Sequence, residues 1–293
     1  PSPCILYCSS PTHTLYHHSF PVQLDFFTYL WYNITRQDVR LERMQKILTT
    51  DDLRETKQHG QPDFQIQYYL DDTREFFNSQ VDWHWHNEFE IVLVSDGSVD
   101  FHIGQHTFTL NAGEAIFINS RVLHQFTTRT YGVMPNIVFS PEFIAPTQTG
   151  IYQKYIAPVE KSALEYLVLR KDCVWQAQIL GAVTALFRLM SEEGYNELQV
   201  RNLLSEAWLI LEEQTRPLLT ENERKADINF SHNSVMVTMQ YIQAHYREPV
   251  SLDDIASTVS ISKNTAIRYF NATIGMSPVD YLISFRINLA CRL

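Results

Sequence analysis

The pattern of hydrophobic and polar positions changes several times along the chain and divides it into segments. Residues 24–57 show helical spacing of apolar side chains in places, so we expect one or two helices within an N-terminal arm that spans residues 1–60. Residues 61–157 carry short runs in which apolar and polar residues alternate, as in Phe64–Tyr68 and Val99–Ile103, and turn residues separate these runs. Several short strands at this spacing predict a β-sandwich or a β-barrel.

Helical periodicity returns in residues 158–213. Apolar side chains recur at steps of three and four residues within Val174–Met190 and again within Leu203–Leu211, and Gly194 separates the two runs. The pattern predicts an antiparallel helical pair. Such a pair could pack only within its own chain, or it could form a dimer interface with a second copy, and the sequence supports both alternatives.

Residues 214–234 turn polar and charge-dense, which predicts a linker between domains. Residues 235–293 are instead rich in helix-capping signals. Ser251–Asp254 has the form of a capping box, and Ser262 is placed to cap a helix over Lys263–Phe270. Two short helices joined by a turn of a few residues predict a helix-turn-helix, a motif that binds DNA.

The second helix of such a motif lies in the major groove, so its outward side chains are candidates for DNA contact. Asn264 and Arg268 suit base edges, because asparagine pairs with adenine and arginine with guanine. Ser262 and Lys263, at the start of the helix, suit phosphate contacts. The alternative for Lys263 and Arg268 is an ordinary solvated face.

Histidines and glutamates that could bind a metal or a ligand also cluster in the segment predicted to form strands. His84, His86, Glu88 and Glu90 alternate along one run and would share one face of a strand, while the apolar residues between them would share the other. A second histidine-bearing run ends at His124. Imidazoles and a carboxylate on one face could hold a divalent metal or hydrogen-bond to a polar ligand.

The spacing of these residues resembles a known fold family. His84-x-His86, followed by Glu90 and Gly97, is similar to the first cupin motif, and Gly113–His124 is similar to the second, although its usual Pro-x-Gly is missing. In cupins the residues at the matching positions, here His84, His86, Glu90 and His124, ligate a metal.

The cupin resemblance leaves three interpretations of this set. The residues could hold a metal for oxygenase or isomerase chemistry. They could be hydrogen-bonded within the barrel wall and serve only the fold. The favoured interpretation is contact with a small-molecule effector and no cofactor, through His84, His86, Glu88, Glu90 and His124.

The C-terminal segment resembles the AraC/XylS transcription regulators. The matching positions lie in register across three helices over about the last fifty residues: Leu252-x-x-Ile255-Ala256, Ser262, Phe270, Gly275-Met276-Ser277-Pro278-x-x-Tyr281-Leu282 and Arg286-x-x-x-Ala290.

The AraC/XylS resemblance implies an α+β protein, with a cupin-like sensing barrel, a helical pair and an all-α helix-turn-helix domain. It implies a regulator rather than an enzyme, with promoter DNA, a small-molecule effector and a second copy of the chain as partners. The family's DNA-binding domain has two helix-turn-helix units, so we expect the sequence to hold a truncated domain with only the first.

Composition adds two constraints. The formal net charge is −10, but the segment from Ser234 onward carries five Lys and Arg against four Asp and Glu, so the charge is +1 there and −11 elsewhere. The four scattered cysteines suit a reducing compartment, and no apolar run is long enough to cross a membrane. We therefore expect a cytoplasmic protein without a membrane partner.

Overall fold

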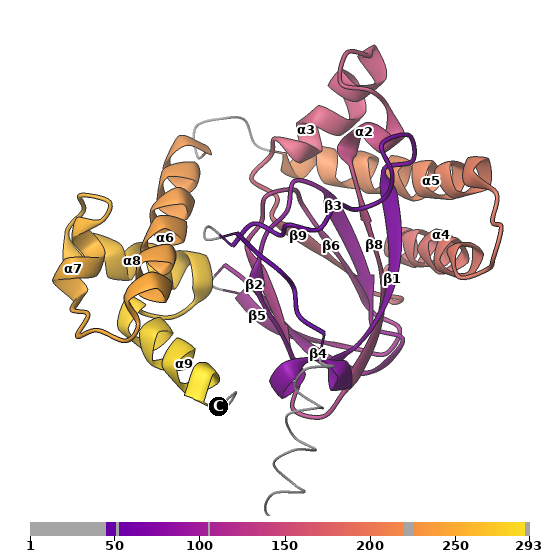
Figure 1. Cartoon of the computed structure of the whole chain (residues 1–293). Coiled ribbons are helices and arrows are strands. Elements are labelled where there is room, and N and C mark those ends of the chain that lie inside the picture. Colours follow the sequence, from indigo (N-terminus) through magenta and orange to yellow (C-terminus); the bar gives the residue numbers. More distant parts are fainter. Residues whose placement is uncertain (1–44, 51–52, 105, 220–224, 291–293) are drawn as a thin grey trace, which may run out of the picture. The chain divides into compact units, whose positions relative to one another are not determined.

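The strands form an antiparallel barrel in the first half of the chain (Figure 1). The computed structural model describes residues 45–50, 53–104, 106–219 and 225–290. Its strands are β1 (Ile66–Asp72), β2 (Gln80–His84), β3 (Phe89–Leu93), β4 (Asp96–Ile103), β5 (His106–Asn111), β6 (Ala115–Ile118), β7 (His124–Thr127), β8 (Gly132–Phe139) and β9 (Tyr166–Leu169). This architecture agrees with the barrel that the alternating pattern predicts.

Two sheets make up the barrel. One runs β1-β8-β3-β6-β9 and the other runs β2-β7-β4-β5, and every pairing is antiparallel. The start of β4 also pairs with β8, which joins the two sheets. The last strand, β9, lies beyond residue 157, so the sheet extends into the segment in which only helices are predicted.

Alternation along β3 sorts its side chains between two cores. Phe89 and Ile91 pack with the helices that cover the outer face of the sheet, whereas Val92 packs with the apolar interior of the barrel. Glu90 alternates with Phe89 and Ile91 and therefore shares the inner face with Val92. The strand thus places a carboxylate inside the barrel while its neighbours fix the helices outside.

The segment before β1 is not helical where the structure describes it. Residues 24–44 of the predicted helices lie outside the described part, but residues 45–50 and 53–57 form isolated bridges and extended chain. Gln45 pairs in parallel with Phe76, and Arg54 pairs in parallel with Trp85. The helix prediction is wrong for these residues, because their backbone groups bond to the barrel instead, as in the bond from the Glu55 N–H to the Trp85 carbonyl.

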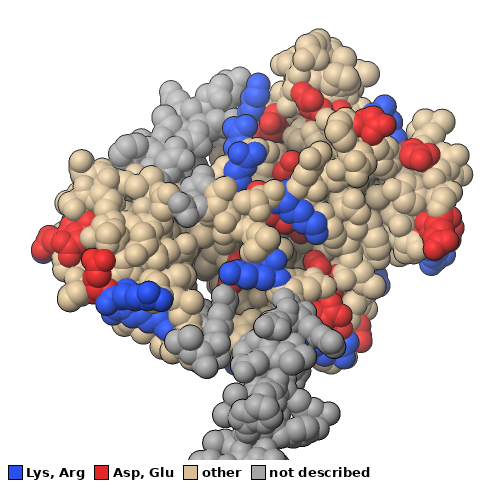
Figure 2. Space-filling view, in the orientation of Figure 1, with Lys and Arg blue, Asp and Glu red and all other residues tan. Residues whose placement is uncertain are grey.

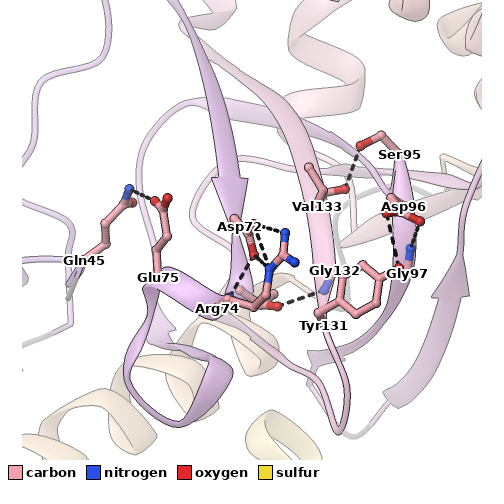
Figure 3. Close-up of polar contacts among 11 residues, drawn as sticks. Gln45, Asp72, Arg74, Glu75, Ser95, Asp96, Gly97, Tyr131, Gly132 and Val133 are labelled. Atoms are coloured by element: carbon pink, nitrogen blue, oxygen red, sulfur yellow. Dashed lines mark hydrogen bonds and ion pairs between the residues drawn. The ribbon is translucent and has the colours of Figure 1, made fainter. Parts of the chain in front are cut away.

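Polar contacts tie together the turns at one end of the barrel (Figure 3). The Asp72 carboxylate accepts hydrogen bonds from the Arg74 guanidinium just after β1, at the start of the short helix η1 (Thr73–Glu75). Gly97 lies in β4 with a positive φ of 76°, and an added Cβ would clash with the Tyr131 carbonyl oxygen. Only glycine fits this turn without strain.

The helices after β8 cover one face of the barrel. They are α2 (Pro141–Ile144), the π-helical turn η3 (Tyr152–Ile156), α3 (Ala157–Glu160), α4 (Val174–Met190) and α5 (Glu197–Thr215). The predicted helical pair is confirmed as α4 and α5. Trp208 of α5 stacks on Phe89, with ring centroids 4.9 Å apart, and its indole N–H donates to the Tyr155 carbonyl.

Four further helices follow: α6 (Lys225–His245), α7 (Leu252–Ser257), α8 (Lys263–Ile274) and α9 (Pro278–Ala290). They share a core that includes Val235, Met239, Ile242, Ile255, Phe270 and Leu282. α6 begins ten residues earlier than predicted, inside the segment interpreted as a linker. Ile228 and Phe230 are the only large apolar residues in its first ten, and their spacing of two residues is not helical, so the pattern gave no sign of the first turns.

The caps of α7 and α8 are those that the sequence predicts. Ser251 and Asp254 form a reciprocal capping box at the start of α7. The Ser262 hydroxyl accepts the Thr265 N–H at the start of α8, and Gly275 ends that helix in the left-handed conformation. The turn between α7 and α8 gives the helix-turn-helix arrangement.

The structure tests the two predictions from composition only for the described residues. No helix within the described ranges combines the length and the apolar character of a membrane span. Cys173 is a free, half-buried thiol, and the other three cysteines lie outside the described residues.

Candidate functional site

Three histidines and a glutamate from four neighbouring segments meet inside the barrel. His84 ends β2, His86 lies in the bend that follows, Glu90 is in β3 and His124 begins β7. All four are buried, and one ligand atom from each lies within 4.8 Å of the others. The pairing of β2 with β7 sets His84 opposite His124, so residues forty positions apart in the sequence become neighbours.

Each imidazole is held by a backbone carbonyl. The Nδ1 atoms of His84, His86 and His124 lie 2.8, 3.1 and 2.8 Å from the carbonyl oxygens of Asp82, Glu88 and Val122, respectively. A carbonyl oxygen only accepts, so each Nδ1 carries a hydrogen and donates it. The lone pair of a neutral imidazole is then on Nε2, which faces the centre of the cluster.

The Nε2 atoms of His86 and His124 both approach one carboxylate oxygen of Glu90. Glu90 Oε2 lies 3.3 Å from His86 Nε2 and 3.2 Å from His124 Nε2. Among the described residues, His124 Nε2 is a buried atom without a hydrogen-bond partner. Lone pairs facing a carboxylate repel one another unless a proton or a metal ion lies between them.

The pKa shifts are consistent with this crowding. Burial and the nearby histidines lower the pKa of His84 to about 3, so its ring is neutral at neutral pH. Burial alone would lower the pKa of His86 as well, but its hydrogen bond and proximity to Glu90 raise it. Burial acts to raise the pKa of Glu90, yet the close approach of the His124 and His86 rings lowers it. Glu90 thus favours the charged form of His86, and the two histidines favour the charged form of Glu90.

The cluster fits a divalent metal. Ligands on opposite sides of a metal, at bonds of about 2.1 Å, are about 4.2 Å apart, so a span of 4.8 Å needs only a small adjustment. Three imidazoles and one carboxylate suit zinc, iron, manganese or cobalt, and the carbonyl bonds to Nδ1 are the outer contacts that orient such ligands. A bound ion would supply an electrophilic centre facing the cavity.

Three residues of the cluster, His84, His86 and Glu90, line a cavity of about 540 Å³. Its other polar lining residues include Glu55, His59, Tyr69, Asp71 and Asn136. None of these was predicted from the sequence. Glu55 and His59 precede the predicted strands, and the only available signal was a carboxylate and a histidine four residues apart.

Glu88, which the sequence grouped with the cluster, is not among the residues that line this cavity. β2 ends at His84 and β3 begins at Phe89, so the chain bends between them and the alternation of faces is interrupted. The Glu88 carboxylate lies 3.9 Å from His86 Nδ1, on the side of the ring away from Glu90. Side chains therefore do not alternate strictly between the two faces across residues 84–90, contrary to what the sequence pattern predicts.

The predicted DNA-contact residues lie on an exposed face of α8. Asn264 and Arg268 are both exposed and one turn apart, while Ala266 and Phe270 are buried on the opposite side. The Ser262 hydroxyl caps the helix, and Lys263 pairs with Asp253 at 2.7 Å. That ion pair is exposed on both sides and therefore weak, so a phosphate could replace its carboxylate.

The C-terminal helices do not present a uniformly basic surface. In Figure 2 acidic and basic side chains both appear on this part of the molecule. This mixture agrees with the charge of +1 that the sequence gives for the segment from Ser234. Attraction to DNA through net charge alone is therefore weak, and specific contacts matter more.

Comparison with known proteins gives a consistent set of relatives. Residues 74–221 match the family model described as the AraC-like ligand binding domain. An uncharacterized HTH-type transcriptional regulator, YdeC of Bacillus subtilis, is 26% identical over 254 residues, with 83% of each chain covered. The lactose operon transcription activator of Staphylococcus xylosus is 19% identical, with 69% of this chain and 68% of that protein covered. Among solved structures, ToxT from Vibrio cholerae is 11% identical at a TM-score of 0.38, with 75% of this chain and 98% of that chain covered.

Proposed function

This chain belongs to the family of AraC-like ligand-binding domains, and from that premise we propose that it is a transcription regulator that reads a promoter sequence through α8 and senses a small-molecule effector in the barrel. Asn264 and Arg268 contact base edges, and Ser262 and Lys263 contact phosphates. The observation that carries this proposal is the exposure of Asn264 and Arg268 on a helix whose other face is sealed into its own domain.

A selection of binding sites from random DNA tests the α8 assignment. Replacing Arg268 with alanine should remove the preference at one base position, at a cost of about 1–3 kcal/mol for that base. Arg247→Ala is the matched control, because it removes the same charge from an exposed site of the same domain outside α8. The same selected motif from wild type and Arg268→Ala would refute the role of Arg268.

The effector occupies the cavity and contacts His84, His86 and Glu90, which line it. His124 is not among the lining residues, but its ring packs against the rings of His84 and His86, so it supports this contact from within the cluster. Glu88 was included in the predicted set but lies outside this lining, so we leave it out of the proposal. A thermal-shift screen of sugars, organic acids and aromatic metabolites would find the effector, because a molecule that binds the folded state raises its melting temperature. A hit that persists in His84→Ala and His124→Ala would place the effector elsewhere.

An enzyme of the metal-dependent cupin type is the second candidate, and the four-residue cluster favours it. We propose the regulator over the enzyme because its relatives are regulators and because an exposed α8 has no purpose in catalysis. Turnover of an oxygen-dependent or isomerase substrate by the metal-loaded protein, with no selection of DNA, would reverse this choice.

We also propose that the chain acts as a homodimer in the cytoplasm. Leu198 and Leu209 of α5 are exposed and eleven residues apart, a spacing that puts them on one helix face. A second copy packing on this face would bury both side chains. Sedimentation should show a dimer that Leu198→Glu converts to a monomer, and a wild-type monomer at high concentration would contradict the proposal.

A further inference from the structure

A second polar group lies beside the histidine cluster in the same cavity. Glu55 and His59 come from the segment that precedes the barrel strands, and both line the same cavity as His84, His86 and Glu90. The His59 ring lies 5.6 Å from the His86 ring, measured between centroids. Glu55 is close enough to His84 and His86 to interact with them electrostatically.

The orientation of His59 leaves one ring nitrogen unsatisfied. Its Nδ1 lies 3.0 Å from the Tyr69 hydroxyl. Its Nε2 lies 3.3 Å from Glu55 Oε2, yet within the described part of the chain this buried atom has no hydrogen-bond partner. The side chains of His59 and Glu55 are only 3% and 5% exposed. The contact with His59 places the Glu55 carboxylate on the cavity wall.

The cavity lining combines three carboxylates with two lysines, Lys46 and Lys57. Glu55, Asp71 and Glu90 contribute carboxylates, and the Nε2 atoms of His84 and His86 contribute lone pairs. The Asn136 amide already donates to Asp71, and the Lys57 ammonium lies over the Tyr69 ring at 3.9 Å. Beside the imidazole lone pairs, Glu90 and Glu55 would stabilise a positive ion and a hydrogen-bond donor, and both carboxylates would repel an anion placed there.

We propose that Glu55 and His59 form an outer wall of a metal site. In this arrangement His84, His86, Glu90 and His124 hold a divalent cation, and Glu55, positioned by His59, accepts a hydrogen bond from the exchangeable ligand of that cation. The ligand is an uncharged hydrogen-bond donor, either water or a hydroxyl group of the effector. This inference rests on the proposed sensing role of the barrel and adds the chemistry by which the effector is recognised.

Cobalt(II) titration of the full chain, followed by visible absorption and calorimetry, tests the proposal with water as the donor. Glu55→Gln, which removes the acceptor charge at constant shape, and His59→Phe should each weaken cobalt binding about tenfold. Glu88→Gln is the matched control. It removes a carboxylate near His86 that lies outside the cavity, and binding should change less than about twofold.

Acetate provides a second measurement on the cobalt-loaded proteins. Acetate should leave the wild-type spectrum unchanged, because Glu55 repels it, and should bind to Glu55→Gln. The proposal is overturned by a wild-type chain that binds no cobalt, by equal losses in Glu55→Gln and Glu88→Gln, or by acetate binding equally to wild type and Glu55→Gln. A chain that still selects a DNA motif after any of these results loses only this inference and keeps its proposed function.

Discussion

Replacing Trp208 with alanine should strongly destabilise the packing of α5 on the barrel. Trp208 is 4% exposed, stacks on Phe89, and meets Phe117 edge-on at 5.9 Å between ring centroids. Truncation of a buried aromatic side chain of this kind costs about 3–5 kcal/mol. Since whole proteins are stable by only about 5–15 kcal/mol, this is a large fraction of the total.

A second substitution separates packing from hydrogen bonding. Trp208→Phe keeps a ring against Phe89 but leaves the Tyr155 carbonyl without its donor, which should cost about 1–3 kcal/mol. Glu206→Ala, at an exposed position on the same helix, should change stability by less than about 0.5 kcal/mol.

Urea unfolding followed by circular dichroism measures these differences, at one fixed protein concentration because association would add to the stability. A loss below about 1 kcal/mol for Trp208→Ala would contradict the close packing of this side chain, because a well-packed indole cannot be removed at so small a cost. Equal losses for Trp208→Ala and Glu206→Ala would refute it as well.

Two further predictions concern pH and helix capping. Burial raises the pKa of Asp71 from its ordinary 3.8 to about 6, so the folded state holds this proton more tightly than the unfolded state. The resulting stabilisation is present below pH 4 and is lost as the pH rises through 6. Relative to Asp71→Asn, the wild type should lose up to about 3 kcal/mol of unfolding free energy between pH 4 and pH 8 in urea titrations. Parallel pH profiles for the two proteins would contradict this. Ser251→Ala removes one half of the capping box of α7 and should destabilise that helix by about 1 kcal/mol. Hydrogen exchange of the α7 amides measures this loss. Unchanged exchange rates would show that the cap contributes nothing to the stability of the helix.

The sequence was informative wherever side-chain periodicity and capping determine the local structure. The alternating runs predicted the barrel, the three- and four-residue steps predicted α4 and α5, and Ser251 and Ser262 marked the starts of α7 and α8. These signals are local, so they survive without knowledge of the tertiary contacts.

The sequence was misleading wherever long-range contacts decide. Residues 45–57, where described, pair with the barrel instead of forming a helix, and so bring Glu55 into the cavity beside the histidines. The bend at Asn87 and Glu88 removes Glu88 from the face that strict alternation assigned to it. Both outcomes depend on where a strand ends in three dimensions, which periodicity does not report.

Genome-wide occupancy measured with tagged protein in its own cells tests the central claim most directly. We expect discrete sites upstream of genes that share one sequence motif, and loss of these sites in the double variant Asn264→Ala, Arg268→Ala. Uniform background signal for the wild type, or unchanged sites in the double variant, would contradict the proposal that α8 of this chain reads DNA.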